Sequence, residues 1–580
     1  MPSDDEFREV LAALSRHELF RPRDGLDYRR RCELTYDRLR VVGEHLPPGS
    51  ALLRDLPRLF TALEWAAVAD PPLFLALTLH VCLSLGAIVE FGGDGAERHV
   101  RELDAMSSFG ALLVTEVGRG NSHLGIRTVA EHDPATGGFR LRTPDEAARK
   151  FMPNVGLANV PKIGVVYARL HAHGRDHGVF PFVTPIRTAD GTPDGVHVTP
   201  LPEAPLLPLD YAVISFDDLL LPPAALLSDT ARLDAAGTLD DPLGDPERRL
   251  RRSLDIRHNA WVASAAALAA VTRAGVVNAL RHARTRTTVS PFTAERAVLD
   301  HRAHQRPLFA ALADCYALTR VVDKVKAARI RSQGRESAGD DGSWLSEPAL
   351  NRTYGLVKAY ASDAAGRIVT ECGLRCGAHG MFTPGRWVEY QGLAHMLGPA
   401  AGDGYLIVLE AARAMASGDH YAPPPPEDRA AGDPLDPASW PVLARTRERL
   451  LHQRLVERME LARGRGQTGF EAWNNRASSG VEFVEAHVAR LVLEAVAEVP
   501  AQARTGPAAR LADALHALHA VRELTAHAGF HLREGLLTGE QVDRLAGRDN
   551  ELCDRVLADL GAVPHLLDVP EEFRHPALSP

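Results

Sequence analysis

The chain has 580 residues, which is too long for one compact core, so two to four domains are expected. Its hydrophobic content of 45% and charged content of 24% are typical of a soluble globular protein. The net charge of −9 argues against a general binder of nucleic acid or of anionic membrane surfaces. Arginine supplies almost all of the basic charge, and lysine is confined to Lys150, Lys162, Lys324, Lys326 and Lys358.

The cysteines and the two ends of the chain bear on the cellular compartment. Cys372 and Cys376 have a spacing that suits neighbouring turns of one helix, and nothing nearby completes a zinc site, so no metal is predicted. Scattered cysteines favour a reduced, cytoplasmic protein. The acidic N-terminus lacks the apolar core of a signal peptide, and the tail Leu578-Ser579-Pro580 is not a peroxisomal address. No segment is predicted to span a membrane.

The first 245 residues change from a helical to a β-rich pattern. Residues 1–112 have helical periodicity, and their most apolar stretch, residues 72–89, lies inside a longer helical pattern. Residues 113–245 consist of short β-rich runs separated by turn residues, which indicates a barrel or a sandwich. The expected strands are Ala111–Val117, Gly138–Leu141, Ile163–Leu170, Val179–Pro185 and Gly195–Thr199.

Helical periodicity returns near Pro246 and continues to the end of the chain. Residues 246–422 are expected to form a helical bundle, because residues 265–280 are mostly Ala, Val and Leu, as in a buried helix. The run Pro423–Pro426 marks a linker, and residues 438–580 form a further helical unit. The pattern therefore predicts a mainly α protein with a central β-domain.

Several motifs are better explained by structure than by chemistry. Gly118-Arg119-Gly120-Asn121 follows an apolar strand, but a hairpin pattern comes after it, which argues against a Rossmann loop. The histidines of residues 171–177 fall in one turn with no further metal ligands, so a solvated turn is favoured. The run Arg248–Arg252 is interpreted as a solvated helix face, with phosphate binding as the alternative. His516 and His519 are interpreted as surface residues.

Ordered motifs between about residues 60 and 415 resemble the acyl-CoA oxidase family. Residues 115–122, Thr-Glu-Val-Gly-Arg-Gly-Asn-Ser, are similar to the family's Thr-Glu-Leu-Gly-His-Gly-Thr-Asn, and residues 376–380 to its Cys-Gly-Gly-His-Gly. Further similar segments are Lys150–Pro153, Val183–Arg187, Phe216–Asp218 and Leu299–Phe309. The resemblance implies the acyl-CoA dehydrogenase/oxidase fold, with an N-terminal helical domain, a β-barrel-like middle domain and a C-terminal helical bundle. The last 143 residues of the sequence would add a further helical domain.

The same resemblance implies that FAD is bound between the β-domain and the helical bundle of a homodimer. By position, Thr115 would face the flavin ring, with backbone groups of Glu116 and Val117 nearby. Asn154 stands where the family has a glycine, and Gly156 could take that glycine's place. The resemblance also assigns the FAD pyrophosphate to Arg286 and close backbone approach to Gly377 and Gly380.

One departure from the family concerns the catalytic base. An ungapped count from His379 places Ala401 where the family has its glutamate, although the following Gly402 is kept. Acyl-CoA oxidation needs a base that takes the α-proton while the β-hydride moves to the flavin. The candidates for a replacement base are Asp403, Asp255 and His258. The residues Phe151-Met152 in place of Trp-Trp, and Arg302 in place of a glutamine, further indicate a reshaped pocket.

The leading functional hypothesis is an FAD-dependent oxidoreductase of the acyl-CoA oxidase type in fatty acid metabolism. It would act on an acyl thioester, linked to CoA or to a carrier protein, or on a related metabolite, with molecular oxygen as the electron acceptor. One alternative is a repurposed flavoprotein oxidase or monooxygenase of specialised metabolism. Another is a non-catalytic family member that keeps the fold as a binding subunit.

Overall fold

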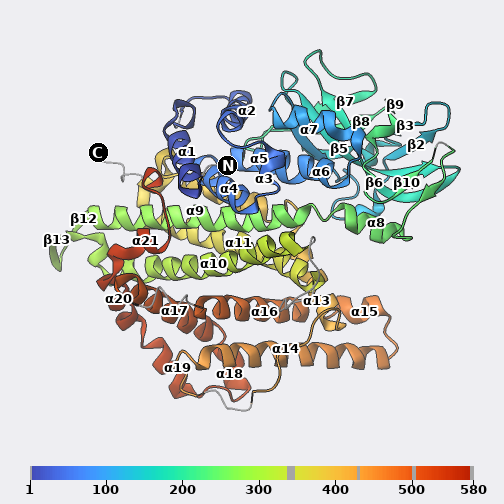
Figure 1. Cartoon of the computed structure of the whole chain (residues 1–580). Helices are drawn as coiled ribbons and strands as arrows, with labels where there is room; N and C mark the ends of the chain where they lie inside the picture. The colour runs from blue at the N-terminus through green and yellow to red at the C-terminus, as the bar shows by residue number, and fades with distance from the viewer. Residues whose placement is uncertain are drawn as a thin grey trace. The chain divides into compact units, whose positions relative to one another are not determined.

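The computed structural model describes residues 3–21, 23–234, 236–335, 347–427, 432–498 and 505–574 (Figure 1). The chain divides into two compact units, Met1–Ala263 and Ser264–Pro580. The tail Leu578-Ser579-Pro580, for which no peroxisomal address is predicted, lies outside the described residues.

Helices open the first unit. They are α1 (Asp4–Arg16), α2 (Tyr28–His45), α3 (Gly49–Leu52), α4 (Leu56–Ala69), α5 (Pro71–Leu77), α6 (Gly86–Phe91) and α7 (Glu97–Asp104). The start of α1 is fixed by a capping box between Ser3 and Glu6. Between α5 and α6 the chain forms the π-helical segment η2 (Thr78–Leu85), which contains His80. The imidazole of His80 accepts the Gly110 N–H at Nδ1 (3.0 Å) and contacts the Leu103 carbonyl at Nε2 (3.2 Å), so both ring nitrogens bind backbone.

Strands follow the helices in the first unit. They are β1 (Phe109–Leu113), β2 (Val129–Asp133), β3 (Gly138–Arg142), β4 (Lys150–Asn154), β5 (Lys162–Ala172), β6 (Arg175–Arg187), β7 (Val196–Pro200), β8 (Tyr211–Phe216) and β9 (Leu219–Leu221), with the short pair β10 (Arg232–Leu233) and β11 (Leu239–Asp240). One sheet has the order β1-β5-β2-β3-β9 with β6 paired to β5, and a second has the order β4-β8-β7. Their inward-facing side chains, among them Phe139, Val166, Phe180 and Ile214, form one buried core.

The expected strands are found, with one difference at the first. The strand β1 ends at Leu113 and does not reach Val117. The residues after it leave the sheet and pair with the start of β4, where Val117 N–H binds the Arg149 carbonyl (2.9 Å) and Phe151 N–H binds the Thr115 carbonyl (2.9 Å). The β-rich pattern of this segment therefore reflects a second partner and not a longer β1.

The arginine run Arg248–Arg252 lies on the short helix α8 (Pro246–Ser253) and departs from the predicted solvated face at Arg249. Arg249 is 1% exposed and forms ion pairs with Asp229 (3.0 Å) and Asp241, while Arg252 pairs with Glu90 (2.7 Å). Buried charges need such partners. Arg248 and Arg251 are exposed as predicted, so the prediction of a solvated face is wrong only at Arg249, with Arg252 partly buried.

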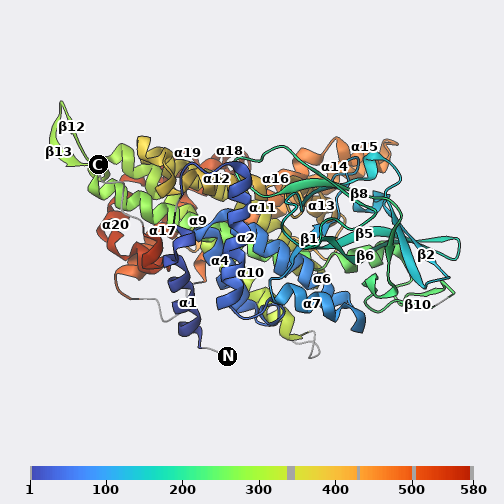
Figure 2. The ribbon, with the colours of Figure 1, turned by 90° about the horizontal axis from the view of Figure 1, so that it is seen from above.

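The second unit contains most of α9 (Arg257–Thr285) and then α10 (Arg302–Arg335), α11 (Glu347–Arg375), α12 (Trp387–Leu397) and α13 (Gly404–Ala416). The helices α10, α11 and α12 pack side by side along the chain order. A hairpin of β12 (Thr287–Ser290) and β13 (Thr293–Ala297) interrupts the helical pattern and stands out at the end of α9 in both views (Figures 1 and 2). The uninterrupted helical periodicity expected after Pro246 missed it, because its strands are polar and its Phe292 is 97% exposed.

A second helical layer completes this unit (Figure 1). Its helices are α14 (Ser439–Gly464), α15 (Gly469–Asn474), α16 (Ala477–Ala497), α17 (Pro507–Ala526), α18 (Ala528–Arg533), α19 (Gly539–Ala546), α20 (Asp549–Ala558) and α21 (Val563–Leu566). The helix α10 packs against both α16 and α17. The prediction that His519 is a surface residue is wrong, since its side chain is 8% exposed and its Nδ1 lies 2.9 Å from Asp314 of α10.

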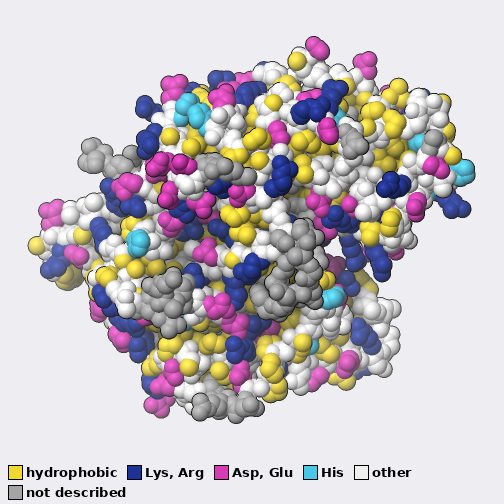
Figure 3. All heavy atoms as spheres, viewed as in Figure 1, with side chains coloured by type: hydrophobic (Ala, Val, Ile, Leu, Met, Phe, Trp, Pro, Cys, Tyr) yellow, Lys and Arg dark blue, Asp and Glu magenta, His cyan; other side chains and the backbone are white. Residues whose placement is uncertain are grey.

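Two helical stretches among the described residues are long and apolar enough to cross a membrane by composition, Pro71–Phe91 and Pro246–Thr285. They are 83% and 94% buried over their most apolar windows, as core helices of a folded protein are. Acidic and basic side chains alternate on the face drawn in Figure 3 and form no stripe of one sign there.

Candidate functional site

The predicted flavin-facing segment of the first unit is organised by the buried carboxylate of Glu116. This carboxylate accepts hydrogen bonds from the N–H groups of Arg127 (2.9 Å) and Thr128 (2.9 Å), and from the Thr128 hydroxyl (2.7 Å). The Lys150 ammonium lies 3.1 Å away, and both side chains of this ion pair are fully buried. The Glu116 side chain is thus committed to holding the loop, and only its backbone remains for a ligand.

Each partner of this ion pair shifts the pKa of the other toward the ionised form, and burial acts against both shifts. Burial lowers the pKa of the Lys150 ammonium to about 8, against the opposing effect of Glu116. Burial acts to raise the pKa of Glu116, but Lys150 and the Thr128 and Arg127 donors hold that pKa below its usual value. At neutral pH the pair is therefore ionised, and its net charge is zero.

The backbone around Thr115 leaves a small set of free groups. Val117 N–H is already bound to the Arg149 carbonyl, and Gly118 N–H to the Ala147 carbonyl (2.8 Å). Within the described residues, neither the Thr115 hydroxyl nor the Glu116 N–H makes a hydrogen bond. A flavin at this loop could therefore bind Thr115 and the Glu116 N–H, but not the Val117 N–H.

Asn154 and Gly156 lie in the interior of the first unit. Asn154 is 1% exposed, and its amide nitrogen approaches Tyr36 Oη (3.3 Å) and the Gly110 carbonyl (3.4 Å). Gly156 N–H binds the Asp210 carbonyl at 2.7 Å, and a Cβ at this position would lie 3.0 Å from that oxygen. Both residues contact protein backbone closely, so their predicted role toward a cofactor stays a prediction.

Two of the three candidate bases, Asp255 and His258, lie together at the start of α9. Asp255 is partly exposed and lies 4.0 Å from His258 Nε2, whereas His258 is 6% exposed and packs edge-on against Trp261. Asp255 also approaches Arg252 at 3.7 Å. The Asp255 carboxylate thus has charged neighbours and access to solvent. A proton-accepting role for Asp255 or His258 stays a prediction.

In the second unit, Arg286 follows α9 and lies against the backbone of Gly377. A Cβ at Gly377, whose φ is +61°, would come within 3.3 Å of Arg286 Nη1. One turn earlier, the ring of His282 packs on that of His379, with 5.1 Å between the centroids. His282 is 4% exposed, and its Nε2 is buried with no hydrogen-bond partner among the described residues.

These basic groups fit an anion. Burial, then the neighbouring His379 and Arg286, lowers the pKa of His282, and burial with Arg375, His301 and Arg286 lowers that of His304. A cluster of cationic and neutral basic side chains with an unpartnered buried nitrogen provides donors for an oxyanion. The pyrophosphate of FAD meets that requirement, so the predicted role of Arg286 extends to its histidine neighbours.

Gly380 has a packing role that its sequence motif does not disclose. A Cβ at this position would lie 2.2 Å from the Gly373 carbonyl oxygen of α11. Only glycine permits this close approach of two backbones. Gly380 therefore positions the segment that carries Gly377 and His379.

The loop that contains Ala401 is held by a lysine. Lys358 of α11 is fully buried, and its ammonium donates to the carbonyls of Gly398 (3.0 Å), Ala400 (2.8 Å) and Gly402 (2.8 Å). Ala401 is exposed and has φ +55°, a left-handed conformation that is uncommon for residues other than glycine. The loop thus presents a methyl group in a backbone shape that Lys358 stabilises.

Lys358 is not a candidate base, although its pKa is low for a lysine. Burial lowers the pKa of its ammonium to about 8, against Asp403 and Asp363. Each of its three protons points to a carbonyl oxygen, so loss of one would leave a lone pair facing an oxygen. The lysine therefore serves as a fixed cation for the backbone.

Asp403 acts as the N-cap of α13. Its Oδ1 accepts the N–H groups of Tyr405 (2.9 Å) and Leu406 (3.3 Å). These two bonds satisfy N–H groups that the start of a helix otherwise leaves unpaired. The structure gives Asp403 a structural role, and its role as a replacement base stays a prediction.

Lys358, His282 and His304 were missed in the sequence. The signal for Lys358 was its isolation: it stands between apolar residues in a chain with only five lysines. The signal for the histidines was their place one turn before Arg286 and just after Leu299-Asp300, in segments that resemble the cofactor-binding part of a family.

Known proteins match both units of this chain. The family model "Acyl-CoA oxidase, C-alpha1 domain" matches residues 256–416, and the model "Acyl-CoA oxidase" matches residues 443–562. The peroxisomal acyl-coenzyme A oxidase 1 of Bos taurus is 25% identical over 510 residues, which cover 81% of this chain and 74% of that protein. The chain belongs to the acyl-CoA oxidase family.

Other relatives in the acyl-CoA oxidase family match over shorter or longer spans. An Arabidopsis thaliana peroxisomal acyl-coenzyme A oxidase 3 is 27% identical, but its match covers only 47% of this chain and 41% of that protein. The crystal structure of acyl-CoA oxidase 1 from Yarrowia lipolytica has a TM-score of 0.83 at 19% identity, covering 98% of this chain and 87% of that one. Acyl-CoA oxidase 2 of Caenorhabditis elegans, crystallised with FAD, ascaroside-CoA and ATP, has a TM-score of 0.82 at 18% identity, with the same coverage. The predicted acyl-CoA oxidase fold is confirmed.

Proposed function

We propose that this chain is an FAD-dependent oxidoreductase of the acyl-CoA oxidase type that acts on an acyl thioester. The observation that carries the proposal is the family match of the second unit, whose basic cluster around Arg286 has the donors an FAD pyrophosphate requires. FAD accepts a hydride when bound, and this chemistry belongs to the cofactor. The protein's residues bind and orient the cofactor and substrate, and handle the proton.

Proton abstraction is the step in which this chain differs from the reaction expected of the family. The position that corresponds to the family's glutamate is Ala401, in a loop whose remaining carboxylate, Asp403, caps a helix. A positioned base contributes roughly 10²–10⁴-fold to such a step. We expect this chain to turn over ordinary acyl-CoA substrates slowly, unless Asp403, Asp255 or His258 supplies the base.

The first experiment asks for the cofactor and the substrate class. The purified protein should have a flavin absorbance spectrum, and the Arg286→Gln variant should retain less FAD after gel filtration. Anaerobic mixing with acyl-CoA thioesters of different chain length should bleach the oxidised flavin. A colourless protein that FAD does not restore would contradict the cofactor assignment, whereas a yellow protein bleached by no acyl-CoA would contradict the substrate class.

The second experiment restores the carboxylate. The Ala401→Glu variant should bleach the flavin faster with acyl-CoA, by about 10²-fold or more if the base alone is limiting. Ala401→Gln is the matched control, because it adds nearly the same volume without a base. Equal rates in both variants would show that the shape of the pocket limits the reaction.

A second function is favoured by the same loop. With Ala401 a methyl and Asp403 bound to helix N–H groups, a flavin oxidase or monooxygenase of specialised metabolism that needs no carboxylate from this loop also fits. Such an enzyme would be reduced by a substrate other than an acyl-CoA, or would react with oxygen after reduction by a nicotinamide cofactor. A faster oxidation of acyl-CoA by Ala401→Glu than by the natural protein is compatible with both functions. The compound that reduces the flavin of the natural protein therefore decides between them.

The remaining partners are part of the proposal. Molecular oxygen is the expected electron acceptor, and hydrogen peroxide production in air would test it. A homodimer and a cytoplasmic location are also expected, and sedimentation and cell fractionation would test them. Loss of FAD binding would favour the non-catalytic alternative, and a flavin spectrum would exclude its flavin-free form.

A further inference from the structure

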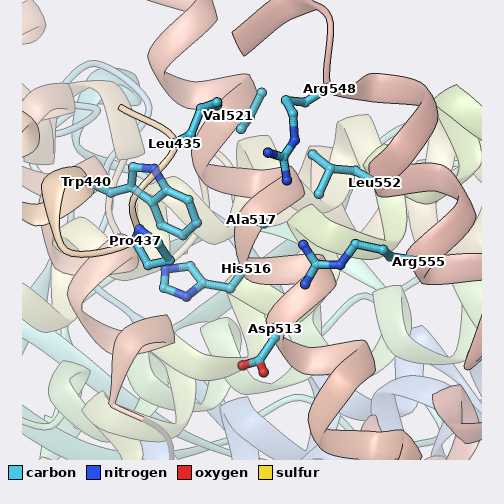
Figure 4. A pocket seen from close by; sticks show the side chains of 10 residues that line it. All are labelled: Leu435, Pro437, Trp440, Asp513, His516, Ala517, Val521, Arg548, Leu552 and Arg555. Carbon is cyan, nitrogen blue, oxygen red and sulfur yellow. The ribbon is translucent and has the colours of Figure 1, made fainter. Parts of the chain in front are cut away.

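A cavity of about 380 Å³ lies within the C-terminal helices of the second unit (Figure 4). It is bounded by the linker before α14, by α14 and α17, and by the segment at the start of α20. Its size is at the lower end of the range for small-molecule sites. None of its residues belongs to the basic cluster around Arg286 or to the Ala401 loop.

One wall of the cavity is apolar and rigid. The indole of Trp440 donates its Nε1 proton to the Pro434 carbonyl (2.8 Å) and meets the ring of His516 edge-on at 4.8 Å. Leu435, Val521 and Leu552 lie in the same wall, of which packing leaves little exposed: Trp440 is 2% and Leu552 is 0% exposed. A flat aromatic ring is the ligand group that such a wall packs against best.

The linker that closes the cavity is held in place without a ligand. Asp433 forms an ion pair with Arg544 (2.8 Å) and also accepts the Leu435 N–H (3.0 Å). Asp436 accepts the Ala438 N–H (3.0 Å) in the same way. These turns fix Leu435 and Pro437 at the rim, so a ligand would meet a preformed site.

The opposite wall carries two guanidinium groups. Figure 4 shows Arg548 and Arg555 directed toward the middle of the cavity. Arg548 pairs with Glu551 (2.8 Å) through Nη2, whereas its Nε is buried with no hydrogen-bond partner within the described residues. Arg555 has no ion pair within 4.0 Å in the part of the chain that the structure describes.

The charges at the cavity include Glu551, a carboxylate outside its lining that pairs with Arg548. Asp513 is the single carboxylate among its lining residues, against the two arginines. Burial and the neighbouring His519 lower the pKa of His516 to about 4, so its ring is neutral at pH 7. Nε2 of His516 is buried and has no hydrogen-bond partner among the described residues. With Glu551 counted, the charges at the cavity balance, and its unused polar groups are Arg548 Nε, His516 Nε2 and the Arg555 guanidinium, which has no ion pair within the described residues.

We propose that this cavity binds a small aromatic anion, with its ring against Trp440 and its oxyanion between Arg548 and Arg555. Guanidinium groups bind carboxylate and phosphate oxygens by charge-assisted hydrogen bonds. The bound molecule would link the interdomain linker to α17 and α20, and so would stabilise the C-terminal helices against unfolding.

The test uses phenyl phosphate as the probe, with inorganic phosphate and phenol as its two halves. Isothermal titration of the full-length protein, as purified, should give a tighter dissociation constant for phenyl phosphate than for either half. In an Arg548→Gln, Arg555→Gln double variant this affinity should fall about tenfold or more. Arg458→Gln changes an exposed arginine of α14 outside the cavity and is the matched control, which should bind as the natural protein does.

Three outcomes would overturn the proposal. They are no binding of phenyl phosphate to the natural protein, equal binding by the double variant, and binding of inorganic phosphate as tight as that of phenyl phosphate. Arg286→Gln separates the two basic sites of the second unit. If it alone abolishes the binding, the probe occupies the cofactor cluster and not this cavity. The double variant changes only partly or fully exposed side chains, so we expect it to fold. Circular dichroism before the titration checks this.

Discussion

Two loops of this protein are stabilised by opposite charges. In the first unit the buried Glu116 carboxylate gathers two backbone N–H groups and a hydroxyl around itself. In the second unit the buried Lys358 ammonium gathers three backbone carbonyls. A carboxylate only accepts hydrogen bonds and an ammonium only donates them. Glu116 therefore binds backbone N–H groups, and Lys358 binds backbone carbonyls.

The difference between the loops lies in what surrounds each charge. Glu116 is paired with the equally buried Lys150, so the first loop contains a neutral pair sealed from water. Lys358 has no carboxylate within ion-pair distance among the described residues, and its carbonyl partners belong to a loop in which Ala401 and Gly402 are exposed. Removing the charge of Glu116 should therefore destabilise the protein more than removing that of Lys358, because water can reach the Ala401 loop.

The largest expected effect comes from Glu116→Gln. The variant leaves the Lys150 charge buried without its partner, which costs about 3–5 kcal/mol in the free energy of unfolding. Urea titration followed by circular dichroism measures it. Glu131→Gln on β2 is the control, because its side chain is 46% exposed and the change should cost less than about 0.5 kcal/mol. Equal costs in the two variants would mean that the buried pair does not stabilise the loop.

His80 is a neutral counterpart of Glu116 and Lys358, because its buried imidazole also binds backbone groups, through both ring nitrogens. Burial, with a contribution from Lys162, lowers the pKa of the His80 imidazole from 6.5 to about 4, against Leu103 and Asp104. The unfolded chain therefore takes up a proton below pH 6.5 that the folded chain does not. The free energy of unfolding should fall by about 3 kcal/mol as the pH drops from 6.5 to 4.

The His80→Gln variant isolates this contribution. Other buried histidines, such as His531 with a pKa lowered to about 4, add to the slope in the natural protein. The difference in unfolding free energy between the natural protein and His80→Gln should shrink as the pH falls. Parallel curves of unfolding free energy against pH would rule out His80 as a contributor.

Lys358→Met should have a smaller effect than Glu116→Gln. Three carbonyls lose a charged donor, but solvent can replace part of the loss at the exposed side of the loop, so about 2 kcal/mol is expected. Lys326→Met is the control, since its ammonium lies 3.9 Å from Asp323 on a helix surface and should contribute less than about 1 kcal/mol. A cost for Lys358→Met above that of Glu116→Gln would reverse the comparison.

The smallest effect concerns Asp403. Asparagine is as good an N-cap as aspartate, so Asp403→Asn should change the free energy of unfolding by less than about 0.5 kcal/mol, while Asp403→Ala should cost about 1 kcal/mol. Flavin reduction by the substrate should survive in Asp403→Asn. A loss of about 10²-fold or more in that variant, with stability unchanged, would instead identify Asp403 as the base.

Much of the fold could be read from local pattern. The apolar run Ile163–Leu170 and the Ala-rich run of residues 265–280 predict a strand and a buried helix, and β5 and α9 lie there. The hairpin β12–β13 was not predicted, because its side chains are mostly exposed and polar and carry no period-2 signal. The buried pairing of Arg249 was missed because Asp229 and Asp241 lie outside α8, at separations that helical spacing does not predict.

The candidate site was predictable only in outline. Ordered motifs placed Thr115, Arg286 and Gly377 by resemblance, and the count from His379 reached Ala401. Which polar groups are already used could not be read in this way. Val117 N–H and the Asn154 amide each bind a partner that only the folded backbone brings close, whereas Asp403 Oδ1 makes a local cap with N–H groups two and three residues later.

The sequence by itself determined the family, the order of helical and β-rich segments, and the absence of a glutamate at position 401, because these depend on residue identity and spacing along the chain. The tertiary structure decided how the charges are used. Lys150, Lys162 and Lys358, three of the five lysines, are fully buried. Burial depends on which segments meet in space, and an ammonium excluded from water must find its oxygen partners there. The loop at Ala401 is held by such a lysine 43 positions earlier in the printed sequence, a distance at which no local pattern could reveal it.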